Sequence, residues 1–166
     1  MKQYLQTSRT EPIYRRMYDQ SMIGVKGRLV DYSFPSKLLY IGELLHFKED
    51  LYPKMDHLVC FMGGNFALGA TLGKPIREIE HLNFKELEDL RIGKELTRTC
   101  TEMYFHTATG LAPEIAHFIS LTRLSDSSKT VKDIHIKVSD SHNLLRPETV
   151  ESLFILWRLT GDIQYR

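Results

Sequence analysis

The sequence predicts a mainly helical, all-α fold in which paired helices are joined by loops and one or two short strands. Three segments carry this prediction. Residues 14–29 and 148–160 repeat apolar side chains at helical spacing, and residues 83–104 begin with a helix start signal. No linker or low-complexity tract divides the 166 residues. We therefore expect one structural unit rather than two domains.

Composition and charge exclude several classes of protein. Apolar residues make up 42% of the chain, which is typical of a globular domain and argues against disorder. The formal net charge is +1, so we expect no nucleic-acid partner and no attraction to an anionic membrane surface. No apolar run approaches the ~18 residues of a membrane span, and the first residues lack the apolar core of a signal peptide.

The first third of the chain predicts one amphipathic helix and a short extended segment. Six residues recur there at helical spacing: Tyr14, Met17, Tyr18, Met22, Val25 and Leu29. Pro35 separates this helix from the apolar segment 37–45. That segment is short enough to be a buried strand or the entry to a helix, and both alternatives stay open.

The segment 55–72 is apolar and rich in small residues. Interior glycines such as Gly63 and Gly64 each cost a helix roughly 1 kcal/mol relative to alanine, so we expect them to serve close packing or access for a ligand. Asp56 and His57 open this predicted helix. The pair is explained either by an N-cap beside a satisfied histidine or by a role in lining a sugar site.

A capping arrangement predicts the start of the next helix. Asn83 is followed three residues later by Glu86, and apolar positions continue towards Tyr104. This helix carries Cys100, and the chain has one other cysteine, Cys60. Two cysteines are too few for a disulfide scaffold or a four-ligand zinc site. Their spacing leaves open a single bridge or two buried thiols.

The last third predicts a strand, a polar turn and a helix. Residues 131–138 alternate apolar and polar side chains, which is typical of a half-buried strand, and a polar turn over residues 139–143 follows. The last helix has Pro147 at its first turn and repeats four apolar residues: Val150, Leu153, Phe154 and Trp157. No later segment covers its far side, so we expect the chain to be an internal part of a longer protein.

Three acidic positions are candidates for chemistry. Glu148 and Glu151 lie on one face of the last helix, just after Arg146, where they either compensate the helix dipole or line a wet, polar cavity. Glu114 ends the turn 110–114, either as an exposed loop residue or as a pocket carboxylate. Acidic residues at the entries of several helices would gather around one pocket in a closed ring of helices.

Three motifs in order along the chain resemble glycoside hydrolase family 47. Residues 143–154, Asn-Leu-Leu-Arg-Pro-Glu-Thr-Val-Glu-Ser-Leu-Phe, resemble its Arg-Pro-Glu helix. Residues 54–61, Lys-Met-Asp-His-Leu-Val-Cys-Phe, resemble its His-Leu-x-Cys-Phe segment, and residues 110–114, Gly-Leu-Ala-Pro-Glu, its Gly-Leu-x-Pro-Glu turn. Residues 35–38 and 42–44 are more similar to the endoplasmic reticulum branch of the family than to the Golgi branch.

The resemblance implies a fold and a reaction. Residues 1–166 would form part of one catalytic domain, an (α/α)7 toroid with short β-hairpin insertions, without its N- and C-terminal parts. The family removes terminal α-1,2-linked mannose from high-mannose N-glycans with inversion, using an acid and a base on opposite faces of the sugar. The resemblance also implies a disulfide between Cys60 and Cys100 and a bound calcium ion.

The cellular role implied by the resemblance is N-glycan processing and endoplasmic-reticulum-associated degradation. The intact family member would act in the lumen of the endoplasmic reticulum or early Golgi as a type II membrane protein, held by an N-terminal anchor that this chain lacks.

The motif match also implies roles for particular residues. Glu148 takes the position of the catalytic carboxylate that activates water, and Glu114 that of another acidic residue of the pocket, so we predict both as catalytic residues. Four further residues match sugar-binding or water-ordering positions: His57, Asp56, Arg146 and Glu151. We expect no calcium ligand in this chain, because the Thr-Glu segment that helps to hold the ion is not found in it.

Departures from the family pattern lie at the ends of the chain. The segment with one catalytic aspartate and the earlier helix with the general acid are not found, so we expect residues 1–166 alone neither to hydrolyse mannosides nor to hold calcium tightly. Two alternatives to a working mannosidase stay open: a non-catalytic glycan-binding quality-control protein on the same scaffold, and an inactive fragment.

Overall fold

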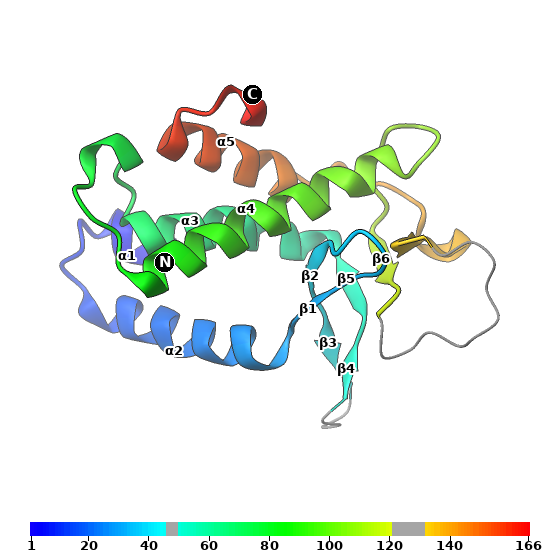
Figure 1. The fold of residues 1–166 in the computed structure, drawn as a ribbon, viewed down its shortest axis with the longest axis horizontal. Coiled ribbons are helices and arrows are strands. Elements are labelled where there is room, and N and C mark those ends of the chain that lie inside the picture. Colours follow the sequence, from blue (N-terminus) through cyan, green and yellow to red (C-terminus); the bar gives the residue numbers. More distant parts are fainter. Residues whose placement is uncertain (46–49, 121–131) are drawn as a thin grey trace.

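Helices dominate the computed structural model of this chain, which describes residues 1–45, 50–120 and 132–166 (Figure 1). The α-helices are α1 (Lys2–Gln6), α2 (Pro12–Arg28), α3 (Phe61–Thr71), α4 (Phe84–Phe105) and α5 (Glu148–Thr160). α3 packs against both α4 and α5. The helices predicted around residues 14–29, 83–104 and after Pro147 are confirmed, including the capping box of Asn83 and Glu86. In the described ranges, no helix combines the length and apolar character that crossing a membrane requires.

Short strands form three small antiparallel sheets at one end of the helices (Figure 1). The strands are β1 (Val30–Tyr32), β2 (Leu39–Ile41), β3 (Glu43–Leu44), β4 (Leu51–Tyr52), β5 (Lys54–Asp56), β6 (Ile115–Phe118) and β7 (Ile134–His135). β1 pairs with β2, β3 with β4, and β5, β6 and β7 form the third sheet. The predicted helical character is thus confirmed. The antiparallel pairs β1–β2 and β3–β4 agree with the short β-hairpin insertions that the resemblance implies, whereas the one or two strands expected from the sequence pattern are too few. Strands of two to four residues are too short to show an alternating pattern.

The two segments predicted as strands have different outcomes. The apolar segment 37–45 forms β2 and β3, so the alternative of a helix entry is wrong. The strand predicted over residues 131–138 is mostly wrong: residue 131 lies outside the described residues, and β7 pairs with β6 over two residues only. Val138 is 93% exposed and begins the 3₁₀ helix η4 (Val138–Asp140). A strand ends where its pairing ends, whatever the side-chain alternation beyond that point.

The predicted disulfide between Cys60 and Cys100 is confirmed. The Cα atoms are 5.9 Å apart, and both residues are fully buried in the main core. The bridge joins the residue that immediately precedes α3 to the second half of α4. The alternative of two free thiols is therefore wrong.

Small residues let α3 approach its neighbours closely. A Cβ atom added to Gly63 would lie 2.2 Å from Thr97 Oγ1 on α4, and one added to Gly64 would lie 2.8 Å from Ile155 Cδ1 on α5. Contacts this short have no room for a side chain. Close packing, one of the two predicted uses of these glycines, is therefore confirmed.

We expect Gly93→Ala to lower the free energy of unfolding by roughly 1–3 kcal/mol, although alanine is the better helix former. The new Cβ would lie 2.6 Å from the backbone oxygen of Gly63, which cannot rotate away. Gly24→Ala in α2 is the matched control, because its Cβ would meet nothing within 4 Å, and it should stabilise by roughly 0.5–1 kcal/mol. Urea unfolding measures both, and equal effects of the two changes would contradict the proposed close contact.

The buried face of α5 differs from the apolar pattern that predicted this helix. Val150 is 62% and Phe154 is 57% exposed. The side chains that α5 buries are Thr149, Ser152, Leu156 and Leu159. Periodicity locates a helix but does not choose between two faces that both carry apolar residues.

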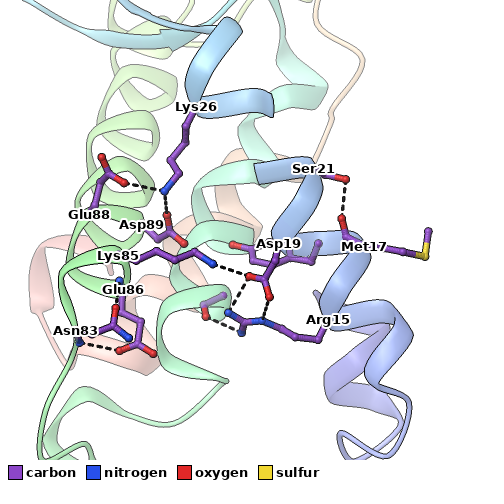
Figure 2. Close-up of polar contacts among 12 residues, drawn as sticks. Arg15, Met17, Asp19, Ser21, Lys26, Asn83, Lys85, Glu86, Glu88 and Asp89 are labelled. Carbon is purple, nitrogen blue, oxygen red and sulfur yellow. Dashed lines mark hydrogen bonds and ion pairs between the residues drawn. The ribbon is translucent and has the colours of Figure 1, made fainter. Parts of the chain in front are cut away.

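Ion pairs hold α2 against α4. α2 fully buries only two side chains in the described structure, Tyr18 and Met22. Figure 2 shows Lys26 of α2 reaching across to α4, where its Nζ lies 2.7 Å from Asp89 Oδ1 and 2.7 Å from Glu88 Oε2. Burial lowers the pKa of Lys26, but the hydrogen bonds to these two carboxylates outweigh it and hold the pKa above its ordinary value.

A second group of charges lies along the same interface (Figure 2). Asp19 accepts from Arg15 one turn earlier at 2.9 Å and from Lys85 of α4 at 2.8 Å. Arg15 also donates to the carbonyl oxygen of Gly69 on α3 at 3.1 Å. Polar contacts therefore tie α2 to both neighbouring helices.

Candidate active site

Two paired strands bring His57 beside Glu114. In the antiparallel register of β5 and β6, Asp56 lies opposite Ile115, and the backbone N–H of His57 donates to the carbonyl of Glu114 at 2.8 Å. The helix predicted to open at Asp56 and His57 begins later than expected: Asp56 ends β5, and the 3₁₀ helix η1 (His57–Cys60) precedes α3. The strand pairing, which the sequence pattern did not show, thus places both residues.

The loop before α5 places Arg146 against Glu114. The backbone N–H of Glu114 lies 3.0 Å from the carbonyl oxygens of both Asp140 and His142, which fixes the loop to the start of β6. Leu145 adopts a left-handed φ of 55°, a conformation that costs a non-glycine residue roughly 1–2 kcal/mol. The guanidinium of Arg146 then forms an ion pair with the Glu114 carboxylate, whose side chain is 13% exposed. Glu114 is thus a largely buried, ion-paired carboxylate rather than an exposed loop residue.

His57 lies at the centre of the group. Its Nδ1 is 3.4 Å from Glu148 Oε2, and its Nε2 is 3.1 Å from the hydroxyl of Tyr104 and 3.3 Å from that of Thr149. The His57 side chain is 2% exposed, whereas that of Glu148 is 17% exposed. Part of the Glu148 side chain is therefore in contact with solvent, whereas the His57 side chain is not.

Burial lowers the pKa of His57 below its ordinary value of 6.5. The neighbouring carboxylates Glu148 and Glu114 oppose this shift, and Arg146 adds to it. Burial has the largest effect, so the imidazole is neutral at pH 7 and takes part as a hydrogen-bonding group rather than as a cation.

The remaining two predicted residues have lysine partners. Asp56 Oδ1 lies 3.2 Å from Lys54 Nζ, yet this buried oxygen accepts no hydrogen bond of good geometry within the described part of the chain. Glu151 forms an ion pair with Lys2, whose Nζ also lies 5.3 Å from the centroid of the Phe61 ring. The structure therefore brings together His57, Glu114, Arg146 and Glu148, and gives Asp56 and Glu151 separate contacts.

Three residues that the sequence analysis did not assign to the site support it. Ser152 accepts from the backbone N–H of Gly64 at 2.8 Å and donates to the carbonyl of Cys60 at 2.6 Å, which locks α5 onto η1 and α3. Tyr104 and Thr149 contact His57. The disulfide was the available signal for Tyr104: His57 precedes Cys60 by three residues, and Tyr104 follows Cys100 by four on the same helix face.

The site residues described above do not form a cluster of metal ligands. In residues 1–45, 50–120 and 132–166, no three or more His, Cys, Asp or Glu side chains are arranged to hold a metal ion. The expectation that the chain carries no calcium ligand stays a prediction.

Comparisons with known proteins agree with the motif resemblance. Residues 1–166 match glycosyl hydrolase family 47. A mannosyl-oligosaccharide 1,2-alpha-mannosidase of Candida albicans is 52% identical over 171 residues, which cover 100% of this chain and 29% of the relative. The endoplasmic reticulum mannosyl-oligosaccharide 1,2-alpha-mannosidase of Homo sapiens is 40% identical over 166 residues, which cover 100% of this chain and 21% of the relative.

A solved structure has a similar fold. The alpha-1,2-mannosidase from Trichoderma reesei superposes with a TM-score of 0.70 at 24% sequence identity, over 98% of this chain and 32% of that one. The chain thus spans less than a third of the length of these relatives. Because the family match extends over every residue, the chain belongs to glycosyl hydrolase family 47.

Proposed function

We propose that this protein hydrolyses terminal α-1,2-linked mannose on high-mannose N-glycans with inversion of configuration. One observation carries the proposal: the partly exposed carboxylate of Glu148 contacts buried, neutral His57, beside the ion pair of Arg146 and Glu114. Membership of the family and the names of the relatives support the substrate class.

Glu148 is the proposed general base. In inverting hydrolysis a carboxylate activates a water molecule on the face of the sugar opposite the departing oxygen. Glu148 is the first residue of α5, and the positive end of a helix dipole stabilises a carboxylate there. His57 limits the rotation of the carboxylate by contacting Oε2. A base that is held in place but open to water is what this step requires.

Arg146, Asp56 and Glu151 are proposed to bind sugar hydroxyls. The Nε of Arg146 is engaged by Glu114, and its two NH₂ groups can donate to hydroxyl oxygens. The Asp56 side chain is 37% exposed although its Oδ1 is buried, so the other carboxylate oxygen can accept from a hydroxyl. Glu114 was predicted as a catalytic carboxylate. Its ion pair with Arg146 supports a role in orienting that guanidinium, because a carboxylate held in an ion pair is a poor proton donor.

The remaining features implied by the resemblance are part of the same proposal. Residues 1–166 would be part of an (α/α)7 catalytic domain whose general acid and calcium ligands lie in other segments. The described residues do not by themselves fit a calcium site, and no step above uses the ion. The relatives named for the endoplasmic reticulum support action in that lumen. The early Golgi, a type II anchor and a role in glycoprotein degradation remain proposals.

The test is Glu148→Gln in the protein at its natural length. We expect kcat for release of mannose from an α-1,2-mannobiose to fall by roughly 10²–10⁴-fold, the usual contribution of a general base. Glu80→Gln, a change of the same kind at an exposed glutamate, is the control and should leave kcat unchanged. Full activity of Glu148→Gln would remove the catalytic assignment.

A non-catalytic glycan-binding protein is the alternative function, since Arg146, Asp56 and Glu151 would serve it equally well. Binding of high-mannose glycans by the parent protein without release of mannose would favour that function. Release of mannose that is lost in Glu148→Gln would favour the enzyme.

A further inference from the structure

Tyr104 contacts the ring nitrogen of His57 that faces away from Glu148. We propose that Tyr104 is a positioning residue: its hydroxyl donates to His57 Nε2, which keeps the His57 proton on Nδ1, directed at Glu148. This inference rests on the proposed role of Glu148 as the base. It assigns to Tyr104 no contact with substrate.

The direction of each hydrogen bond follows from the chemistry of the partners. An ionised carboxylate only accepts hydrogen bonds, so the proton between His57 and Glu148 must be on Nδ1, 3.4 Å from Oε2. A neutral imidazole carries one proton, so Nε2 must then accept. The hydroxyls of Tyr104 at 3.1 Å and Thr149 at 3.3 Å are both able to donate to it.

Tyr104 is the better placed of the two donors. Its oxygen is the closer one, and its ring meets the His57 ring edge-on, with centroids 5.8 Å apart and planes at 74°. It projects from α4 one turn after Cys100, whose disulfide to Cys60 ties α4 to the 3₁₀ helix that begins at His57. The disulfide therefore holds the two elements that carry His57 and Tyr104 next to each other.

The opposite tautomer would place the lone pair of Nδ1 against the carboxylate of Glu148. That arrangement is repulsive, and it would leave Glu148 Oε2 without the His57 donor. Tyr104 thus acts on the base through the imidazole, in a chain that runs from the Tyr104 hydroxyl through His57 to Glu148.

The test is ¹⁵N NMR of the imidazole groups in the protein at its natural length, with His57→Gln used to assign the His57 signals. We expect the parent protein to show a protonated Nδ1 and an unprotonated Nε2. In Tyr104→Phe the ratio of this tautomer to the other should fall about five-fold. This change corresponds to the loss of one hydrogen bond with a net contribution of about 1 kcal/mol. Kcat should fall with it while KM stays unchanged.

Tyr32→Phe is the matched control, because its hydroxyl contacts Arg91 and Glu95 rather than His57. It should change neither the His57 signals nor kcat. A parent spectrum with the proton on Nε2 would overturn the inference without any variant, as would an unchanged tautomer ratio in Tyr104→Phe. If instead Glu148→Gln keeps full activity while the tautomer behaves as expected, the proposed base fails and the role of Tyr104 towards His57 stands.

Discussion

Replacing both bridged cysteines by alanine, Cys60→Ala with Cys100→Ala, is expected to lower the free energy of unfolding by about 4 kcal/mol. The bridge joins residues separated by 40 positions, and in the chain-entropy model a loop of that size restricts the unfolded chain by this amount. Both cysteines are fully buried, so alanine adds no unpaired polar group to the core. Urea unfolding of the oxidised parent and of the double variant measures the difference.

Chemical reduction of the parent protein is the control for this experiment. Reduction opens the same loop without deleting the two sulfur atoms, so it should reproduce most of the loss. The bridge also ties His57 to Tyr104, and the tautomer of His57 should therefore become less uniform in the double variant. A double variant that unfolds at the same urea concentration as the parent would show that the bridge does not stabilise the fold.

Lys26→Met is expected to lower the free energy of unfolding by roughly 3–5 kcal/mol. The side chain of Asp89 is only 2% exposed, and Lys26 is its ion-pair partner at 2.7 Å. Removing the ammonium would leave a buried carboxylate without its counter-charge, which costs far more than the ion pair itself contributes. Glu88 would lose the same partner at little cost, because its side chain is 38% exposed and remains hydrated. Urea unfolding again provides the measurement.

Lys85→Met is the matched control for Lys26→Met. Lys85 also joins α4 to α2, but its side chain is 45% exposed, and its partner Asp19 keeps Arg15. Lys85→Met should lower the free energy of unfolding by less than about 1 kcal/mol. A second change, Asp89→Asn in the Lys26→Met background, should recover part of the stability by removing the buried charge. Equal effects of the two lysine changes would contradict this account.

Much of the helical structure could be predicted from local patterns. α4 begins at the capping box of Asn83 and Glu86, and α2 follows the spacing of Tyr18 and Met22, because caps and periodicity involve residues within a few positions of one another. The short strands could not be predicted. β5 is a strand because it pairs with β6, about sixty residues further on, and no local alternation marks it.

The candidate site was predicted in its members but not in its arrangement. Motif resemblance identified Glu148, Glu114, His57 and Arg146, which the structure brings together. It also identified Glu151, which the structure pairs with Lys2. Of these residues, Glu148 has its proposed role tested directly, by Glu148→Gln.

The sequence by itself determined the family, the helices α2, α3, α4 and α5 and the cysteines that could pair, because motifs, caps and periodicity are properties of short segments. Only the tertiary structure decided which face of α5 is buried and which hydroxyls reach His57. Tyr104 is 47 residues from His57 and Thr149 is 92, and no pattern within a segment reports a contact over such a separation. Those contacts depend on how α3, α4 and α5 pack, which is decided by close approach at glycines and by the buried bridge.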